Sequence, residues 1–399
     1  MARVVFAAPF AMEATLRFME AVAALPGVRM GLLSQEGPEW LPAGLRAKLA
    51  GHGRIDDLLD PATLAEGVRA WGRKRGGVDR LVGTLEQLQV PLAQVREGLG
   101  IPGMGVQAAE RFRDKALMKE TLRAAGVPCA RHVLASSYEE AERFRREVGF
   151  PLVLKPPAGA GAKATVRVEN GVELVETMRE FRPGPGREVL VEEFVRGEEH
   201  SFDTVSLQGR AVWHSLSHYE PSPLEVLENP WIQWCVIVPR EVDDARYDDI
   251  RRVAVRTLDA LGMDSGVTHM EWFRRPDGSL AVSEVAARPP GAQFCSVISY
   301  ANDFDFYRAW AQAVVYETFD APQRRYAAGA AYLRGQGRGR VKAIHGLDTL
   351  QNEMGGLVVE ARLPSGGQPP SDSYEGDGYV ILRHPETSVV ARALRRLVR

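Results

Sequence analysis

Residues 268–291, THMEWFRRPDGSLAVSEVAARPPG, constrain the fold more than any other segment of the sequence. The dipeptide Asp277-Gly278 separates two apolar runs, and it favours a two-residue β-turn with positive φ at both positions. If these residues form the turn of a hairpin, Glu271 pairs with Glu284. Side chains alternate along a strand, so both carboxylates point to one face of the sheet.

Two glutamates on one face of a hairpin predict a cation between them, because like charges placed directly across a sheet destabilise it. Apolar neighbours such as Met270 and Trp272 also make free solvation of these carboxylates costly. Oxygen ligands without cysteine favour Mg²⁺ or Mn²⁺, and Mg²⁺ is typically held by one or two carboxylates together with substrate phosphates. A solvated hairpin with two unrelated glutamates is the alternative.

Two lysines and a glycine-rich loop supply the complementary charge. Lys115 lies early in a helical segment, and Lys155 ends the strand PLVLK, so each could hold triphosphate oxygens. Gly159 and Gly161 would let backbone amides approach anionic oxygens, with Lys163 at the tip of the loop. The alternative is that both lysines are solvated and that the loop is a surface turn.

The segment 191–203, VEEFVRGEEHSFD, reads as a strand that ends in a short connector and restarts. Such a connector could act as a hinge between two lobes. Its free backbone N–H and C=O groups can pair with adenine, and a carboxylate can accept from ribose hydroxyls. Taken alone, this acidic run is also typical of a solvated turn.

The sequence predicts a mixed α/β protein. With 399 residues, about two or three subdomains are expected. Apolar periodicity predicts a first α/β domain up to about residue 105, a small α/β lobe, a large lobe with the hairpin, and a tail of short strands with a closing helix at 387–398. One continuous helix is expected over 108–125.

Composition indicates a globular protein that acts on small molecules. The formal net charge is −2 without a basic tail, which argues against a nucleic-acid or membrane-surface partner. Three widely spaced cysteines fit a reduced compartment. The amino terminus has no secretory leader, and no stretch reaches membrane-spanning length, so a cytoplasmic location is expected.

A competing motif, G-x-G-x-x-A, occurs at residues 103–108 before a helix. This is the pattern of a dinucleotide-binding turn, but such a turn should follow a strand, and LGIP at 99–102 is not one. The motif is therefore a weak sign of dinucleotide binding.

Four segments in this order resemble the ATP-grasp superfamily: RFRDKALMKETLRAAGVP, FPLVLKPPAGAGAK, VEEFVRGEEHSFD, and HMEWF with SEVAARPPG. GVTHMEW and the tail resemble the amino-acid ligase and carnosine-synthase-like branch. The resemblance implies an ATP-grasp fold with a Rossmann-like domain at 1–107, a small lobe at 108–195, a large lobe at 196–320 and a β-rich carboxy-terminal subdomain at 321–399. It is compatible with a homodimer, since dimers are common in the family.

Carried over residue by residue, the resemblance implies roles in ATP binding, metal binding and catalysis. The implied ATP contacts are Lys115, Lys155, Gly159, Gly161, Glu192, Glu193, Phe194, Val195 and Glu199. The implied metal ligands are Glu271 and Glu284, and the implied catalytic residues are Arg288, Lys155 and Lys163. The family usually reads Glu-x-Asn-x-Arg in the last strand, whereas Ala286 stands here in place of the asparagine ligand. The expected pairing puts His269 opposite Ala286, so His269 or water is hypothesised to fill the gap.

The resemblance implies a ligase that uses Mg·ATP (or Mn·ATP) to convert a carboxylate into an acyl phosphate, which an amine then attacks. Within the superfamily, a biotin-carboxylase-like enzyme and a purine-pathway carboxylating enzyme are alternatives. A nucleotide-binding regulator with little turnover is the alternative from another class, and Ala286 favours it.

Overall fold

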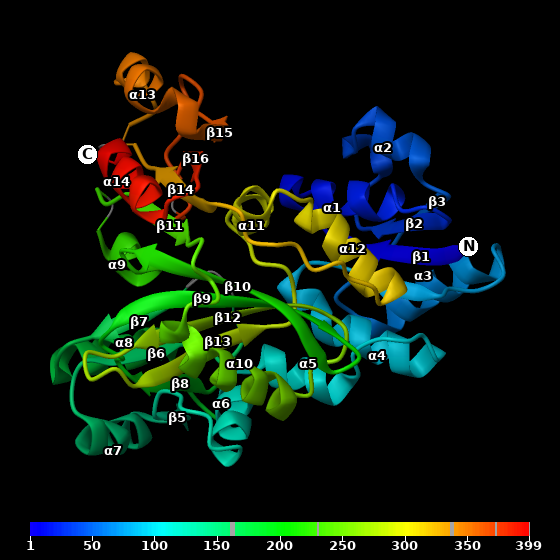
Figure 1. The fold of residues 1–399 in the computed structure, drawn as a ribbon. Coiled ribbons are helices and arrows are strands. Elements are labelled where there is room, and N and C mark those ends of the chain that lie inside the picture. The colour runs from blue at the N-terminus through cyan, green and yellow to red at the C-terminus, as the bar shows by residue number, and fades with distance from the viewer. Residues whose placement is uncertain (160–163, 230, 336–338, 372, 399) are drawn as a thin grey trace.

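The computed structural model describes residues 1–399 except 160–163, 230, 336–338, 372 and 399. The described residues form three sheets with helices packed on them (Figure 1). The amino-terminal sheet is parallel, a second small sheet lies in the middle of the chain, and a large antiparallel sheet runs to the carboxy-terminal region. This arrangement confirms the predicted α/β class.

The amino-terminal domain holds a four-stranded parallel sheet in the order β3-β2-β1-β4. Its strands are β1 (Ala2–Ala7), β2 (Val28–Ser34), β3 (Gly51–Arg54) and β4 (Arg80–Val82). Its helices are α1 (Glu13–Ala23), α2 (Ala43–Lys48), α3 (Pro61–Arg73) and α4 (Gln89–Leu99). β1 is apolar and buried over most of its length, as expected for a parallel strand with helices on both faces.

The middle of the chain forms a small lobe with the antiparallel sheet β5-β8-β6-β7. Its strands are β5 (His132–Ala135), β6 (Leu152–Lys155), β7 (Val166–Val168) and β8 (Val189–Glu193). Its helices are α5 (Val106–Arg113), α6 (Lys115–Ala124), α7 (Tyr138–Val148) and α8 (Gly171–Phe181).

The single helix expected over 108–125 is wrong. Asp114 has extended backbone angles and separates α5 from α6, and its carboxylate accepts from the backbone N–H groups of Ala116 and Leu117. An aspartate in this position is a strong helix N-cap, which begins a new helix at Lys115. The cap therefore gives Lys115 the first position of α6.

An eight-stranded sheet, in the order β13-β12-β9-β10-β11-β14-β16-β15, forms the rest of the protein. Its strands are β9 (Glu198–Leu207), β10 (Arg210–Glu220), β11 (Trp234–Val238), β12 (Gly266–Arg274), β13 (Leu280–Ala286), β14 (Ala327–Leu333), β15 (Val358–Arg362) and β16 (Gly378–His384). The accompanying helices are α9 (Pro223–Glu228), α10 (Asp248–Leu261), α11 (Phe294–Asn302), α12 (Phe306–Tyr316), α13 (Leu347–Met354) and α14 (Thr387–Leu397).

Helix α12 connects the amino-terminal domain to the large sheet, and in Figure 1 it lies beside α1. The Trp310 ring on α12 makes edge contacts with Phe18 and Phe6, with ring centroids 5.0 and 6.2 Å apart. Edge-to-face aromatic packing of this kind stabilises an interface beyond its buried area. Through α12, the amino-terminal domain is thus packed beside the start of β12.

No helix in the described part of the chain is long and apolar enough to cross a membrane.

Candidate functional site

The predicted hairpin is formed by β12 and β13, with Glu271 opposite Glu284 and His269 opposite Ala286. Its turn, however, is not the predicted one. Arg275 N donates to Ser279 O at 2.9 Å, so the turn spans residues 276–278. Only Gly278, with φ 83°, has left-handed backbone angles, whereas Asp277 does not.

A β-bulge restores the predicted pairing. Glu271 pairs with Glu284, but Trp272 pairs with Val282, so Ser283 is an extra residue on β13. A bulge shifts the register by one residue. The longer turn shifts it in the opposite direction, and the two changes cancel. The predicted pairing is therefore confirmed although the predicted turn is wrong.

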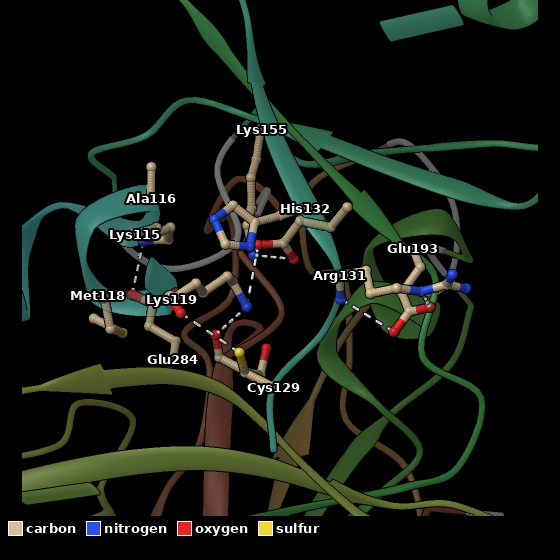
Figure 2. A network of polar contacts seen from close by, with 12 residues as sticks. Lys115, Ala116, Met118, Lys119, Cys129, Arg131, His132, Lys155, Glu193 and Glu284 are labelled. Carbon is tan, nitrogen blue, oxygen red and sulfur yellow. Dashed lines mark hydrogen bonds and ion pairs between the residues drawn. The ribbon is translucent and has the colours of Figure 1, made fainter. Parts of the chain in front are cut away.

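Lys115 reaches this hairpin from the first turn of α6. Its Nζ lies 2.7 Å from Glu284 Oε1, and it also donates to the carbonyl oxygen of Gly159 at 3.0 Å. The Lys115 side chain is only 7% exposed, so this ion pair is largely shielded from water. Figure 2 shows the contact between Lys115 and Glu284. The structure therefore brings one predicted phosphate-binding lysine to one predicted metal ligand.

Glu192 on β8 lies between two buried lysines. Its Oε2 is 3.0 Å from Lys155 Nζ, and its Oε1 is 3.2 Å from Lys119 Nζ. Burial opposes the charged carboxylate, but the two lysines outweigh it and lower the pKa of Glu192 to about 2. Lys119 also donates to Ser283 O at 2.8 Å, which links α6 to the bulge.

Lys155 stands close to the acidic hairpin as well. Burial disfavours its charge, but the carboxylates of Glu192 and Glu284, with a smaller effect of Glu271, raise the pKa of Lys155. Lys155 is therefore a cation in a buried acidic environment. This is the electrostatic setting expected of a group that binds phosphate oxygens.

Glu199 and Glu271 are two neighbouring carboxylates in the acidic part of the site. Burial, followed by the charge of Glu271, holds the pKa of Glu199 well above its usual range, although Lys155 opposes the shift. Two neighbouring carboxylates of this kind favour a bound cation. In the described residues, no group of three or more His, Cys, Asp or Glu side chains is arranged to hold a metal ion by itself.

His269 is bound to Asp203, a residue that sequence reasoning did not single out. His269 Nδ1 lies 2.7 Å from Asp203 Oδ1, and its Nε2 lies 3.4 Å from the Tyr219 hydroxyl and 3.8 Å from Glu271 Oε1. Burial opposes protonation, but Asp203 and then Glu271 raise the pKa of His269 to about 9. A protonated imidazole offers no lone pair to a metal. Ala286 is buried opposite it and has no ligand atom.

Arg288 follows β13 and contacts the amino-terminal domain. Its Nε donates to Glu86 Oε2 at 2.5 Å, and its Nη1 donates to Pro289 O at 2.9 Å. Burial disfavours the guanidinium charge, but Glu86 outweighs it and raises the pKa of Arg288. Glu86 was not predicted, because it is distant in sequence from every other site residue.

The predicted hinge, Glu193 to Val195, connects β8 to β9. Glu193 accepts from Arg131 Nε at 2.8 Å in the small lobe and from Arg275 Nη2 at 3.2 Å next to the hairpin turn. Phe194 N donates to Pro151 O at 3.2 Å. One carboxylate thus joins both sides of the hinge. Of the loop residues, Gly159 is described, whereas Gly161 and Lys163 lie outside the described residues.

Comparison with known proteins places these features in a family. The family model of the ATP-grasp domain matches residues 120–297. An L-arginine-specific L-amino acid ligase from Bacillus subtilis is 26% identical over 262 residues, which are 64% of this chain and 62% of that protein. The chain therefore spans less than two thirds of the length of that relative.

Solved structures share the fold over the whole chain. An L-amino acid ligase from Bacillus licheniformis superposes with a TM-score of 0.78 at 20% identity, covering 100% of this chain and 97% of that one. An N5-carboxyaminoimidazole ribonucleotide synthetase from Thermotoga maritima gives a TM-score of 0.72 at 19% identity, with 100% and 98% covered. At these identities the likeness establishes the fold alone.

Proposed function

Because the chain belongs to the ATP-grasp superfamily, we propose that it is an ATP-dependent ligase that joins a carboxylate to an amine through an acyl phosphate and releases ADP and phosphate. The substrates are small molecules, and the proposed location is the cytoplasm, in keeping with three cysteines that form no disulfide. The similarity to L-amino acid ligases supports amino acids as the substrate class.

The observation that carries this proposal is the meeting of buried lysines and hairpin glutamates. Lys115 on α6 lies 2.7 Å from Glu284 on β13 of the hairpin, and Lys155 on β6 lies 3.0 Å from Glu192 on β8, so residues of four different elements meet here. A triphosphate supplies anionic oxygens for the lysines, and a divalent ion supplies positive charge for the glutamates. We therefore assign Lys115, Lys155 and the backbone around Gly159 to the phosphates.

Glu271 and Glu284 fit a divalent metal ion, which we assign as Mg²⁺. The pKa of nearby Glu199 is raised first by burial and then by the charge of Glu271, and a bound cation would favour the charged form of both carboxylates. With Ala286 in the asparagine position, further coordination would come from phosphate oxygens or water, as is usual for Mg²⁺. When bound, the ion would neutralise charge on the phosphates.

The proposed reaction has two steps. An oxygen of the substrate carboxylate attacks the γ-phosphorus of ATP, the bond to ADP breaks, and an acyl phosphate forms. Lys155 and Arg288 are assigned to neutralise the charge that develops on the transferring oxygens. The amine then attacks the acyl carbon, phosphate leaves, and the amine loses a proton. Glu192, the hinge backbone from Glu193 to Val195, and Glu199 are assigned to adenine and ribose.

Two other functions have specific support. The fold shared with a carboxyaminoimidazole ribonucleotide synthetase supports a carboxylating enzyme, and the missing asparagine ligand supports a regulator with low turnover. Phosphate release separates the three. A ligase releases phosphate only with both a carboxylate and an amine, a carboxylating enzyme requires bicarbonate, and a regulator shows no substrate-dependent release.

We expect Glu284→Gln to lower ATP turnover by roughly 100-fold or more, because it removes the anion that would bind the metal ion and that orients Lys115. The measurement is phosphate release with Mg·ATP and pooled amino acids, read together with product mass. Glu198→Gln is the matched control, since its carboxylate is 82% exposed and it belongs to none of the assigned roles. Near-normal turnover of Glu284→Gln with an intact fold would contradict the assigned site.

A further inference from the structure

A cavity of about 60 Å³ lies between the amino-terminal domain and the large sheet. Its walls come from the end of β4, the segment 102–104, the start of β12, and the residues after β13, among them Arg288. The carboxyl ends of parallel strands are where open α/β sheets bind ligands. A cavity of this size holds a few water molecules or about one carboxylate group.

Arg96 of α4 lines this cavity without a carboxylate partner. Its Nε and Nη2 donate to Leu81 O at 3.0 and 2.8 Å, and no acidic group in the described part of the chain lies within ion-pair distance. Burial lowers the pKa of Arg96 to about 10, and Asp264 opposes the shift from farther away. The side chain is still a cation at neutral pH. Nη1 makes no hydrogen bond to any described residue, and Arg96 is one of the residues that line the cavity.

The other charges in the cavity are balanced. Arg80 lies 3.6 Å from Glu317, and Arg288 lies 2.5 Å from Glu86. Among the described residues that line the cavity, Arg96 is thus the arginine without an ion-pair partner, and the opposing charge of Asp264 acts on it only from farther away. A buried charge without a partner is costly, so the site favours an anion.

Gly103 allows Arg96 to reach the cavity. A Cβ on Gly103 would lie 3.0 Å from Arg96 Cδ and 3.2 Å from its Nε, and the residue has φ +142°, which other residues rarely adopt. The motif G-x-G-x-x-A at 103–108 thus has a local explanation. Its first glycine makes room for an arginine side chain, which removes the reason to assign the motif to a dinucleotide.

We propose that Arg96 binds the non-reacting carboxylate of an amino-acid substrate, with Arg288 at the same cavity directed to the reacting end. This inference rests on the proposed ligase function and narrows it, because at least one substrate must then carry a carboxylate that is not consumed. A guanidinium holds a planar carboxylate through paired hydrogen bonds. Inorganic phosphate, a product of the proposed reaction, offers similar chemistry, and the test separates the two.

The first experiment measures binding without turnover. The thermal transition of the wild type is followed with a pool of the twenty common L-amino acids, with the pool of their amides, and with inorganic phosphate. We expect the acids to raise the transition of the wild type, the amides to raise it less, and Arg96→Gln to lose the difference. Equal shifts by acids and amides, or an Arg96-dependent shift by phosphate alone, would overturn the proposal.

The second experiment measures turnover with each amino acid, or its amide, as the amine substrate and with the carboxylate substrate kept the same, so that only the non-reacting carboxylate differs. The wild type should prefer the acid by on the order of 10-fold or more in kcat/KM, and Arg96→Gln should abolish the preference with KM for ATP unchanged. Arg96→Lys keeps the positive charge and should retain part of the preference for the acid. Arg73→Gln, an exposed position on α3, is the control. If Arg96 only held the Leu81 carbonyl, Arg96→Gln would lower the melting temperature and leave the preference intact.

Failure of the proposed ligase function and failure of the Arg96 assignment give different results. If the wild type releases no phosphate with any acid and amine, the ligase function is wrong, and the thermal shifts still decide whether Arg96 binds a carboxylate. If turnover is present and the preference persists in Arg96→Gln, only the Arg96 assignment is wrong.

Discussion

Glu192 illustrates how a single side chain can have a structural role that a family pattern does not reveal. The resemblance implies a role at adenine, which stays a proposal, and the structure adds that the carboxylate is held between Lys119 and Lys155. Lys119 is fully buried and was missed, because the alternation of Lys and Glu in KALMKET is typical of a solvated helix face. Only the contacts of Lys119 with Glu192 on β8 and with Ser283 on β13 show that this lysine points inward.

We expect Glu192→Gln to lower the free energy of unfolding by about 3–5 kcal/mol, because it leaves two buried lysines without a carboxylate. Chemical denaturation measures the difference from the wild type. Glu192 has a folded pKa of about 2, below its ordinary value of 4.5, so its contribution is present above pH 4.5 and is lost as pH falls toward 2. Glu180→Gln on the exposed face of α8 serves as the control. A gap between variants that stays constant from pH 6 to pH 3 would argue against this pairing.

For the secondary-structure elements, the sequence predicts most strands and helices, but it does not predict the helix break at Asp114 or the β-bulge at Ser283. The break at Asp114 is visible as an N-cap only once the helix is known to restart, since DKALMK also continues a helical pattern. The bulge at Ser283 has no local signal, because Ser283 is held by Lys119 from a distant helix. The pairing of the two glutamates was predicted correctly because the longer turn and the bulge shift the register by one residue in opposite directions.

The hinge between β8 and β9 gives a prediction for nucleotide binding. Glu193 joins Arg131 and Arg275, whose side chains are 59% and 30% exposed, so the pairs add less than about 1 kcal/mol to stability. They orient the two lobes around the proposed adenine site. Glu193→Gln should therefore raise KM for ATP several-fold while the melting temperature changes little. Glu188→Gln, directly before β8, is the comparison, and an equal KM for both variants would count against this role.

At the scale of the whole molecule, the tail is not a separate layer. β14 pairs with β11 along its length, and β16 pairs with β14, so one sheet runs from the hairpin into the carboxy-terminal region. The division at residue 320 stays a prediction about domains. Sequence alone could not show this continuity, because the pairing of β11 with β14 joins segments separated by α10, α11 and α12.

Shortening the chain to residues 1–320 should therefore destabilise the remainder, because it leaves β11 as an unpaired apolar edge in the large sheet. Exposed edges of this kind promote aggregation. Size-exclusion chromatography and circular dichroism would detect aggregates or loss of native signal. A monodisperse fragment with native spectra would show that the first 320 residues fold without the tail.

The ion pairs that hold Lys115 to Glu284 and Lys155 to Glu192 have one more consequence. Glu284 and Glu192 are each already paired with a lysine. In the proposed site, a divalent ion that binds Glu284 alone would have to displace Lys115. A triphosphate that binds alone would have to separate Lys115 from Glu284 or Lys155 from Glu192. When the ion and the triphosphate bind together, the ion becomes the new partner of the glutamate and the phosphates become the new partners of the lysines, so no charge is left without a partner. If the proposed function holds, a divalent ion and a nucleotide should therefore bind more tightly together than either binds alone.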